Sequence, residues 1–319
     1  MKWLLFTLIL IFPVHLLLAQ GDNPPVKSDF EHYKQLNDKE LRLAEYKDDD
    51  DALSIKLIQL EVINRSRKKF RAAPVNLDIL ASRVANRICR EAAENKFISH
   101  WNLTGEKPYH RYAFAGGYDH VSENAYGSWS SGSYEISGSV INKMMQDGHR
   151  TFMAEKAPND GHKKNIIDRA HNFVGIGFYI TNNQFRYYEE FIDRYLEFEG
   201  IPSRLKVNEQ ASIGVKPIGP GYLYFLIVYR EDFPKSQRAS QLSRKGSYED
   251  FSNEEYLTIP AWDLSRYRNG NTYKIPLNFT KEGLYYIQIF LDKKENSRST
   301  SLNTQGKSAV SGIVIRVTR

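Results

Sequence analysis

The sequence predicts an α+β fold in two domains, an α/β/α layered domain followed by a small all-β domain. Helix-type periodicity dominates up to residue 152, and strand-type runs begin at residue 174. Beyond Gly200-Ile201-Pro202 only short β-rich runs separated by Gly and Pro remain. The length of 319 residues fits two ordinary domains.

The N-terminal residues have the pattern of a secretory signal. Lys2 precedes an apolar run from Leu4 to Leu18, and Ala19 stands at a cleavage position. We expect a signal peptide over residues 1–19 and a secreted or periplasmic mature protein. An uncleaved anchor is the alternative, because Leu17 stands where a small residue is preferred. No later segment is apolar enough to span a bilayer, so no membrane span is expected after cleavage.

The single cysteine and the distribution of charge exclude some classes of function. Cys89 is the only cysteine, so no intramolecular disulfide can form. Its place in a helical pattern beside Ala85 and Ala92 indicates an inert core thiol rather than a nucleophile. The net charge of +6 is spread along the chain and alternates with acids, which argues against a nucleic-acid partner.

Residues 20–50 are polar, contain Pro24-Pro25 and predict a linker. The acids from Asp48 to Asp51 suit the positive end of the following helix dipole. A calcium site is the alternative there, although the ligand spacing and glycine of a calcium loop are missing.

Helices are predicted over Leu53–Phe70, from Asp78 to Ala92 and from Glu135 to Phe152. The Gly-, Pro-, Tyr- and His-rich stretch from Asn95 to Trp129 predicts an ordered loop, and the runs 174–180 and 185–192 predict a hairpin. We place the first domain at 51–198 and a β-sandwich of immunoglobulin-like size at 203–319. The runs expected as its strands are Leu205–Val207, Ser212–Pro217, Leu223–Tyr229, Thr272–Leu277, Leu284–Leu291 and Gly312–Val317.

Four polar residues stand in turn-rich contexts that packing does not explain: His100, Glu123, Glu155 and His162. Two histidines and two carboxylates suit either an acid/base pair or a divalent metal site, such as zinc, with His100 and His162 as ligands. Asp160 is expected to cap the helix that starts near His162. The helix dipole disfavours a charged ring there, so His162 is expected to be neutral, as a ligand or base requires.

The order of the segments resembles a known family. "FISHWNLTGEKPYHRYAFAGGYDHVSENAYG", "APNDGHKKNI" and "NFVGIGFYI" are similar to the CAP superfamily of cysteine-rich secretory proteins, antigen 5 and pathogenesis-related proteins, also termed SCP-like, in its bacterial secreted form. The preceding "LEVINRSRKKFRAAPVNLDILASRVANRICREAAENKF" is similar to the first two helices of that family, so the resemblance covers about Leu53 to Glu197.

The resemblance implies an α/β/α sandwich with a cleft that holds two histidines and two acids. His100 and His162 match the two family histidines, and Glu123 matches the first glutamate. Glu155 is the candidate for the second glutamate, because eukaryotic members place theirs farther upstream, where this chain has Met144-Met145-Gln146.

Three interpretations of the cleft follow. In the first, it binds a divalent metal or a cell-surface lipid, glycan or peptide. In the second, it is a metal-dependent extracellular hydrolase of peptidase type, with Glu123 or Glu155 as base. In the third, the four residues only tie the loops together. Each requires His100, Glu123 and His162 to converge on one cleft.

Overall fold

A four-stranded sheet forms the middle layer of the first domain in this computed structural model, which describes residues 30–219, 221–246, 248, 255–295, 301–303 and 305–319. The strand order is β1-β3-β4-β2, so β2 is an edge strand. The strands are β1 (Asn76–Leu77), β2 (His120–Trp129), β3 (Phe173–Ile180) and β4 (Gln184–Asp193). β3 and β4 pair antiparallel, which confirms the predicted hairpin.

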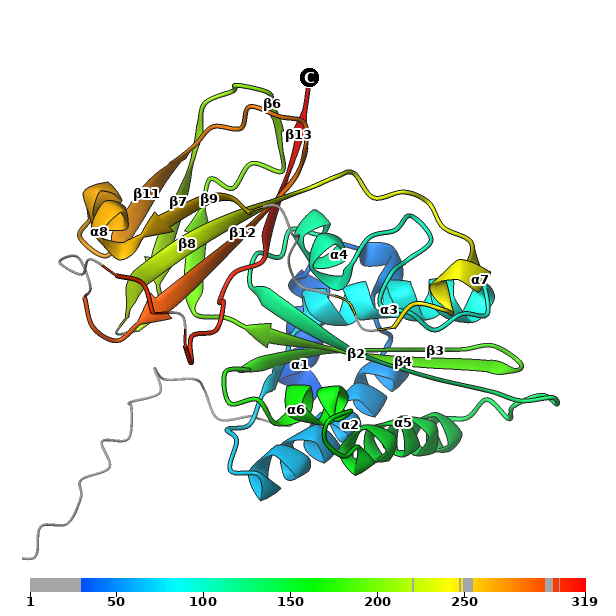
Figure 1. Cartoon of the computed structure of the whole chain (residues 1–319). Coiled ribbons are helices and arrows are strands. Elements are labelled where there is room, and N and C mark those ends of the chain that lie inside the picture. Colours follow the sequence, from blue (N-terminus) through cyan, green and yellow to red (C-terminus); the bar gives the residue numbers. More distant parts are fainter. Residues whose placement is uncertain (1–29, 220, 247, 249–254, 296–300, 304) are drawn as a thin grey trace, which may run out of the picture.

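Helices cover both faces of this sheet (Figure 1). α3 (Ile79–Glu94) and α4 (Pro108–Phe114) lie on one side, and α2 (Asp50–Lys69), α5 (Gly138–Ala154) and α6 (Gly161–Ile167) lie on the other. The three layers agree with the predicted α/β/α architecture. The Gly175-Ile176-Gly177 pattern is explained by packing, because a Cβ on Gly175 would lie 2.4 Å from the backbone of Ala81 in α3.

Carboxylates cap the first two long helices. Asp49 accepts a hydrogen bond from the backbone N–H of Ala52 at 2.8 Å, and Asp78 accepts one from Ala81 at 2.6 Å. Asp48 is instead buried and pairs with the buried Lys56 at 2.7 Å. The acidic run thus serves the start of α2, as expected from the helix dipole.

Two sequence-based expectations are wrong in this region. The linker predicted over residues 20–50 contains α1 (Phe30–Lys39) and a 3₁₀ turn, η1 (Ala44–Tyr46), because Tyr33 and Asn37 are buried and Arg83 donates to the Asn37 carbonyl at 2.7 Å. The loop predicted from Asn95 to Trp129 contains α4 and β2. The predicted signal peptide lies outside the described residues.

The second domain is a sandwich of two sheets, ordered β10-β11-β7-β5 and β6-β13-β12-β8-β9, whose apolar side chains form one core. All six predicted strands are present. The elements are β5 (Leu196–Glu199), β6 (Arg204–Lys206), β7 (Ala211–Pro217), β8 (Tyr222–Glu231), α7 (Ala239–Leu242), β9 (Glu255–Pro260), α8 (Ala261–Leu264), η2 (Ser265–Tyr267), β10 (Arg268–Asn269), β11 (Thr272–Leu277), β12 (Gly283–Asp292) and β13 (Ile313–Thr318).

The domain boundary lies earlier than predicted. β5 falls within the range 51–198 assigned to the first domain, yet it pairs with β7 of the second. The change of domain therefore follows Asp193, the last residue of β4.

The two domains share a hydrophobic cluster. Tyr109 of α4 stacks on Tyr286 of β12 with ring centroids 4.1 Å apart, and its hydroxyl donates to Glu231 at 2.5 Å. Leu80 and Val84 of α3 lie in the same buried cluster as Leu284 and Val314. The second domain is therefore packed against the α3–α4 layer rather than hanging from a flexible connection.

Two further expectations concern single features. Cys89 is fully buried, and burial raises the pKa of its thiol well above the usual value, which agrees with an inert core residue. In the part of the chain that the structure describes, no helix is both long enough and apolar enough to cross a membrane.

The shared cluster predicts coupled unfolding. Replacing Tyr286 with Ala removes a fully buried ring from the junction and should lower the free energy of unfolding by about 3–5 kcal/mol. Urea denaturation followed by circular dichroism measures this change, with Leu257→Ala as the control at an exposed apolar side chain. A Tyr286 variant as stable as the control would show that the junction contributes little.

Candidate functional site

A cleft of about 500 Å³ opens where the edge strand β2 meets α6. All four residues singled out from the sequence, His100, Glu123, Glu155 and His162, line it. They come from four segments: the loop before α4, strand β2, the end of α5 and the start of α6. The fold thus brings together side chains that are far apart in the sequence.

His100 is held by contacts to its ring and by a contact to its backbone carbonyl. Its Nδ1 lies 2.7 Å from Oε1 of Glu123, while Arg111 of α4 donates to the other Glu123 oxygen. Arg111 also donates to the backbone carbonyl of His100 at 2.6 Å. The preceding residue is fixed as well, because Tyr188 donates to the Ser99 carbonyl at 2.8 Å. The ring orientation of His100 is therefore determined by buried partners.

His162 has a matching partner on the opposite wall. Its Nδ1 lies 2.5 Å from Oε1 of Glu155, and its ring stacks on Phe152 with centroids 4.6 Å apart. The second Glu155 oxygen accepts the backbone N–H of His162 at 3.0 Å. One carboxylate therefore both orients the ring and caps the start of α6.

The predicted role of Asp160 as the cap of α6 is wrong. Its side chain makes no capping hydrogen bond and instead pairs with Lys164 at 2.7 Å. Glu155 takes the capping position because it approaches the N-terminus of α6 from the end of α5 and reaches two donors of His162 at once.

The two histidine–glutamate pairs face each other. The ring centroids of His100 and His162 are 6.5 Å apart, with the ring planes inclined by 30°. In each pair the carboxylate takes Nδ1, so Nε2 is the ring nitrogen directed away from the carboxylate. This is the arrangement in which outer carboxylates orient metal-binding histidines.

A buried acidic pair lies beneath the cleft. Burial raises the pKa of Glu123 to about 7, although Arg111 acts in the opposite direction. Burial and the neighbouring Glu123 raise the pKa of Glu190, on β4, well above the usual value. Glu190 lies 3.5 Å from the Arg111 guanidinium and interacts with the Glu123 carboxyl group. The Arg111 guanidinium thus interacts with the carboxyl groups of both Glu123 and Glu190.

Tyr248 of the second domain also lines the cleft, which the sequence did not indicate. Its ring lies 4.7 Å from that of His100, and its hydroxyl accepts the backbone N–H of Glu123 at 3.1 Å. The chain reaches this place along α3, where Leu242 of α7 is fully buried and Lys245 lies 4.1 Å from the Trp101 ring centroid. The segment that carries Leu242, Lys245 and Tyr248 is therefore docked on the first domain.

A polar network on the α6 side contains a serine, a histidine and an aspartate. Ser122 lies 3.4 Å from Nε2 of His171, whose Nδ1 lies 2.7 Å from Asp193. Asn165 intervenes, because its Oδ1 accepts from the Ser122 hydroxyl at 2.7 Å and lies 2.9 Å from the same His171 nitrogen. The Ser122 proton points to an amide oxygen instead of a base, so the network positions α6 against β2.

The donor set fits a metal only in part. Within the described ranges, no group of three or more His, Cys, Asp or Glu side chains is arranged to hold an ion. His100 and His162 offer two nitrogens, and their 6.5 Å ring separation is long for zinc–nitrogen bonds of about 2.0–2.1 Å. A zinc complex would need the rings to approach each other and would take its other ligands from water or from a bound molecule.

Comparisons with known proteins give structural similarity alone. No family model and no curated protein matches the chain. An extracellular protein containing a SCP domain from Bacillus anthracis is similar over 43% of this chain and 39% of its own, with 17% identity and a TM-score of 0.32. An outer surface protein from Borrelia burgdorferi is similar over 44% of this chain and 92% of its own, with 19% identity and a TM-score of 0.35.

A cysteine-rich secretory protein from Staphylococcus aureus is similar over 43% of this chain and 37% of its own, with 14% identity and a TM-score of 0.28. Two of these descriptions name the family that the sequence resembles. The similar region spans well under half of the Bacillus and Staphylococcus proteins, and it transfers no activity to this chain.

The acidic pair predicts a specific pH dependence. A carboxyl group whose pKa is raised by folding binds more protons in the native state, so stability falls as pH rises from its unfolded to its folded pKa. Glu190→Gln removes one such group and gives Glu123 an amide donor. The variant should lose less free energy of unfolding than the parent between pH 5 and pH 8, because it has one fewer carboxyl group that must release a proton in the folded state; urea denaturation at each pH measures the difference. Glu199→Gln, at an exposed carboxylate of β5, is the control and should follow the parent; an equal slope in all three proteins would contradict the prediction.

Proposed function

We propose that this chain is an extracellular CAP-like protein whose cleft binds a divalent metal, with zinc as the first candidate, and uses it to recognise a cell-surface ligand. The single observation that carries the proposal is the pair of facing histidines, each oriented by a carboxylate at Nδ1. The predicted signal peptide supports the extracellular location.

Two protein ligands suit a recognition site better than a structural metal centre. Structural zinc sites are closed by four protein ligands, whereas sites that bind a further molecule keep positions open. His100 and His162 would hold the metal, and both line a cleft of about 500 Å³ that has room for a further molecule. That volume lies within the range of small-molecule sites, about 300–1,000 Å³.

The cleft walls suit an oxygen-rich or amide-containing ligand. The residues that line the cleft include the polar Ser122, Asn124 and Asn165 and the aromatic Tyr248. Glu123 donates its backbone N–H outward from the edge of β2, where Tyr248 now accepts it. A ligand carbonyl could replace the Tyr248 hydroxyl at this donor, as an added strand does at a sheet edge.

A metal-dependent hydrolase using the same cleft is the second candidate. The observation in its favour is Glu155, a half-buried carboxylate 2.5 Å from His162, which is placed to take a proton beside the metal ligands. A bound zinc would supply Lewis acidity there. Ser122 contributes no nucleophile while its hydroxyl donates to Asn165.

Zinc titration by calorimetry tests the proposal. The parent protein should bind one zinc ion, and the His100→Ala, His162→Ala double variant should lose at least about tenfold in affinity, because metal-site changes of this size are typical. His32→Ala, at an exposed histidine of α1, is the matched control and should bind as the parent does.

Three results separate the candidates. Loss of zinc binding in the double variant alone supports the metal site, and zinc-dependent cleavage of peptide or ester substrates that Glu155→Gln abolishes would favour the hydrolase. Absence of zinc binding by the folded parent would contradict both and leave the four residues as ties between loops.

A further inference from the structure

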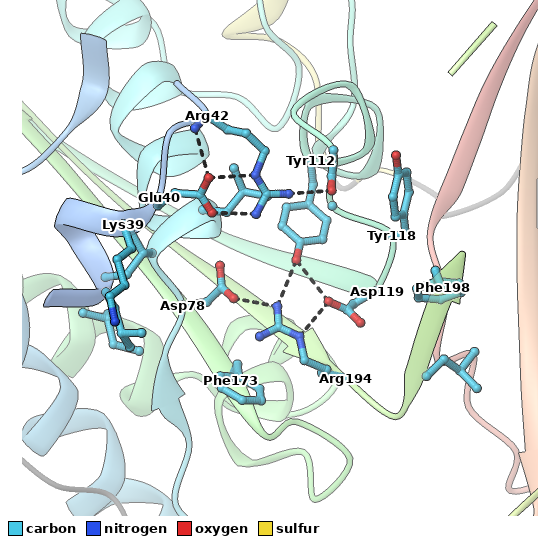
Figure 2. A pocket seen from close by; sticks show the side chains of 17 residues that line it. Lys39, Glu40, Arg42, Asp78, Tyr112, Tyr118, Asp119, Phe173, Arg194 and Phe198 are labelled. Atoms are coloured by element: carbon cyan, nitrogen blue, oxygen red, sulfur yellow. Dashed lines mark hydrogen bonds and ion pairs between the residues drawn. The ribbon is translucent and has the colours of Figure 1, made fainter. Parts of the chain in front are cut away.

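A second cavity, of about 530 Å³, lies at the junction of the two domains (Figure 2). Its walls come from three parts of the chain: the end of α1 and the turn after it, the first domain around Asp78 and Asp119, and the start of the second domain from Arg194 to Phe198 of β5. No residue that lines this cavity lines the histidine cleft, so the two are separate sites. Its volume also lies within the usual range for ligand sites, about 300–1,000 Å³.

The floor of this junction cavity is a fixed polar group. The Arg194 guanidinium lies between two carboxylates, 2.6 Å from Asp78 and 3.0 Å from Asp119, and it lies over the Phe173 ring at 4.4 Å from the centroid. The Tyr112 hydroxyl donates to Asp119 at 3.2 Å (Figure 2). These contacts hold the Arg194 and Asp119 side chains in one orientation. Neither side chain therefore needs to reorganise to bind a ligand.

Asp119 and Arg194 each have one side-chain atom that makes no hydrogen bond to another described residue. Every hydrogen bond of the Asp119 side chain goes to Oδ2, and Figure 2 shows its other oxygen turned away from Arg194. Oδ1 has no partner among the described residues, although Asp119 is only 6% exposed. Nη1 of Arg194 likewise makes no hydrogen bond within the described part of the chain. The cavity lining thus offers one acceptor oxygen, on Asp119, and one donor nitrogen, on Arg194.

Two aromatic rings line the same cavity. Tyr118 and Phe198 meet edge to face with centroids 5.9 Å apart, one from each domain, beside Asp119 (Figure 2). Both rings are half-buried, so each presents part of its surface to the cavity. Such rings stack well on a ligand with an apolar face and polar edges.

The lining of the junction cavity has no net formal charge. It contains three cations (Lys39, Arg42 and Arg194) and three acids (Glu40, Asp78 and Asp119), whose formal charges cancel. A neutral ligand whose groups both donate and accept hydrogen bonds suits this lining best. Neighbouring hydroxyls on a sugar ring do both, and the C–H face of the ring packs on aromatic side chains.

We propose that the junction cavity binds a neutral sugar unit of a glycan. Asp119 accepts a hydrogen bond from one ring hydroxyl, Arg194 donates to another, and the Tyr118–Phe198 pair takes the apolar face of the ring. The site exists only where the two domains are packed together, because Phe198 comes from the second domain and Asp119 from the first. This assignment does not depend on metal binding in the cleft.

Saturation-transfer NMR and calorimetry with neutral oligosaccharides of glucose, mannose and N-acetylglucosamine test this proposal on the mature chain. At least one of these should bind, and Tyr118→Ala and Asp119→Ala should each weaken binding by about tenfold, which one aromatic or polar contact can account for. Tyr118 is the informative position if the Asp119 variant fails to fold, because its side chain is half-exposed and belongs to no ion pair.

Controls separate this site from the cleft. The His100→Ala, His162→Ala variant should bind the sugar as the parent does, whether or not zinc binds. Failure of all the neutral oligosaccharides to bind would overturn the assignment, and so would binding that survives Tyr118→Ala. A sugar affinity lost in the cleft variant but kept in Tyr118→Ala would move the glycan site to the cleft and contradict the proposal.

Discussion

The buried ion pair between Arg111 and Glu123 is the interaction on which most of the structure depends. Both side chains are almost completely buried, and the same guanidinium holds the backbone carbonyl of His100 at 2.6 Å. Losing one partner of such a pair leaves an uncompensated charge and costs about 3–5 kcal/mol. The pair thus joins α4, the His100 loop and the edge strand β2 at one point.

The same short helix connects this ion pair to the second domain. Tyr109, two residues before Arg111, stacks on Tyr286 and donates to Glu231. A second connection is the segment after α7, in which Tyr248 contacts the ring of His100. The β-sandwich therefore helps to build both cavities, one through Tyr248 and the other through Phe198.

The sequence predicted the scaffold well because its signals are local. The periodicity of α2 and α3 and the Asn182-Asn183 turn of the hairpin can be identified without knowing any distant contact. β2 was not recognised, because its side chains are polar on both faces. Glu123 pairs with Arg111 on one face and Asn124 with Glu189 on the other, so the strand lacks the usual apolar alternation.

Long-range partners account for the other differences. Asp160 has the right residue type for a cap, but Glu155 approaches the same N–H from a different helix. Tyr248 lies in a polar stretch whose docking depends on the buried Leu242. The four cleft residues could be chosen from motif order, yet the network that orients them, Arg111 and Glu190 above all, became visible only in three dimensions.

Zinc K-edge X-ray absorption on the zinc-loaded protein tests the central claim most directly, because it reports the ligands themselves. The account predicts two imidazole nitrogens at about 2.0–2.1 Å and oxygen atoms in the remaining positions, with the imidazole signal absent from the His100→Ala, His162→Ala variant. A zinc spectrum without imidazole scattering, or one that is identical in the variant, would contradict the claim that the two facing histidines form the metal site.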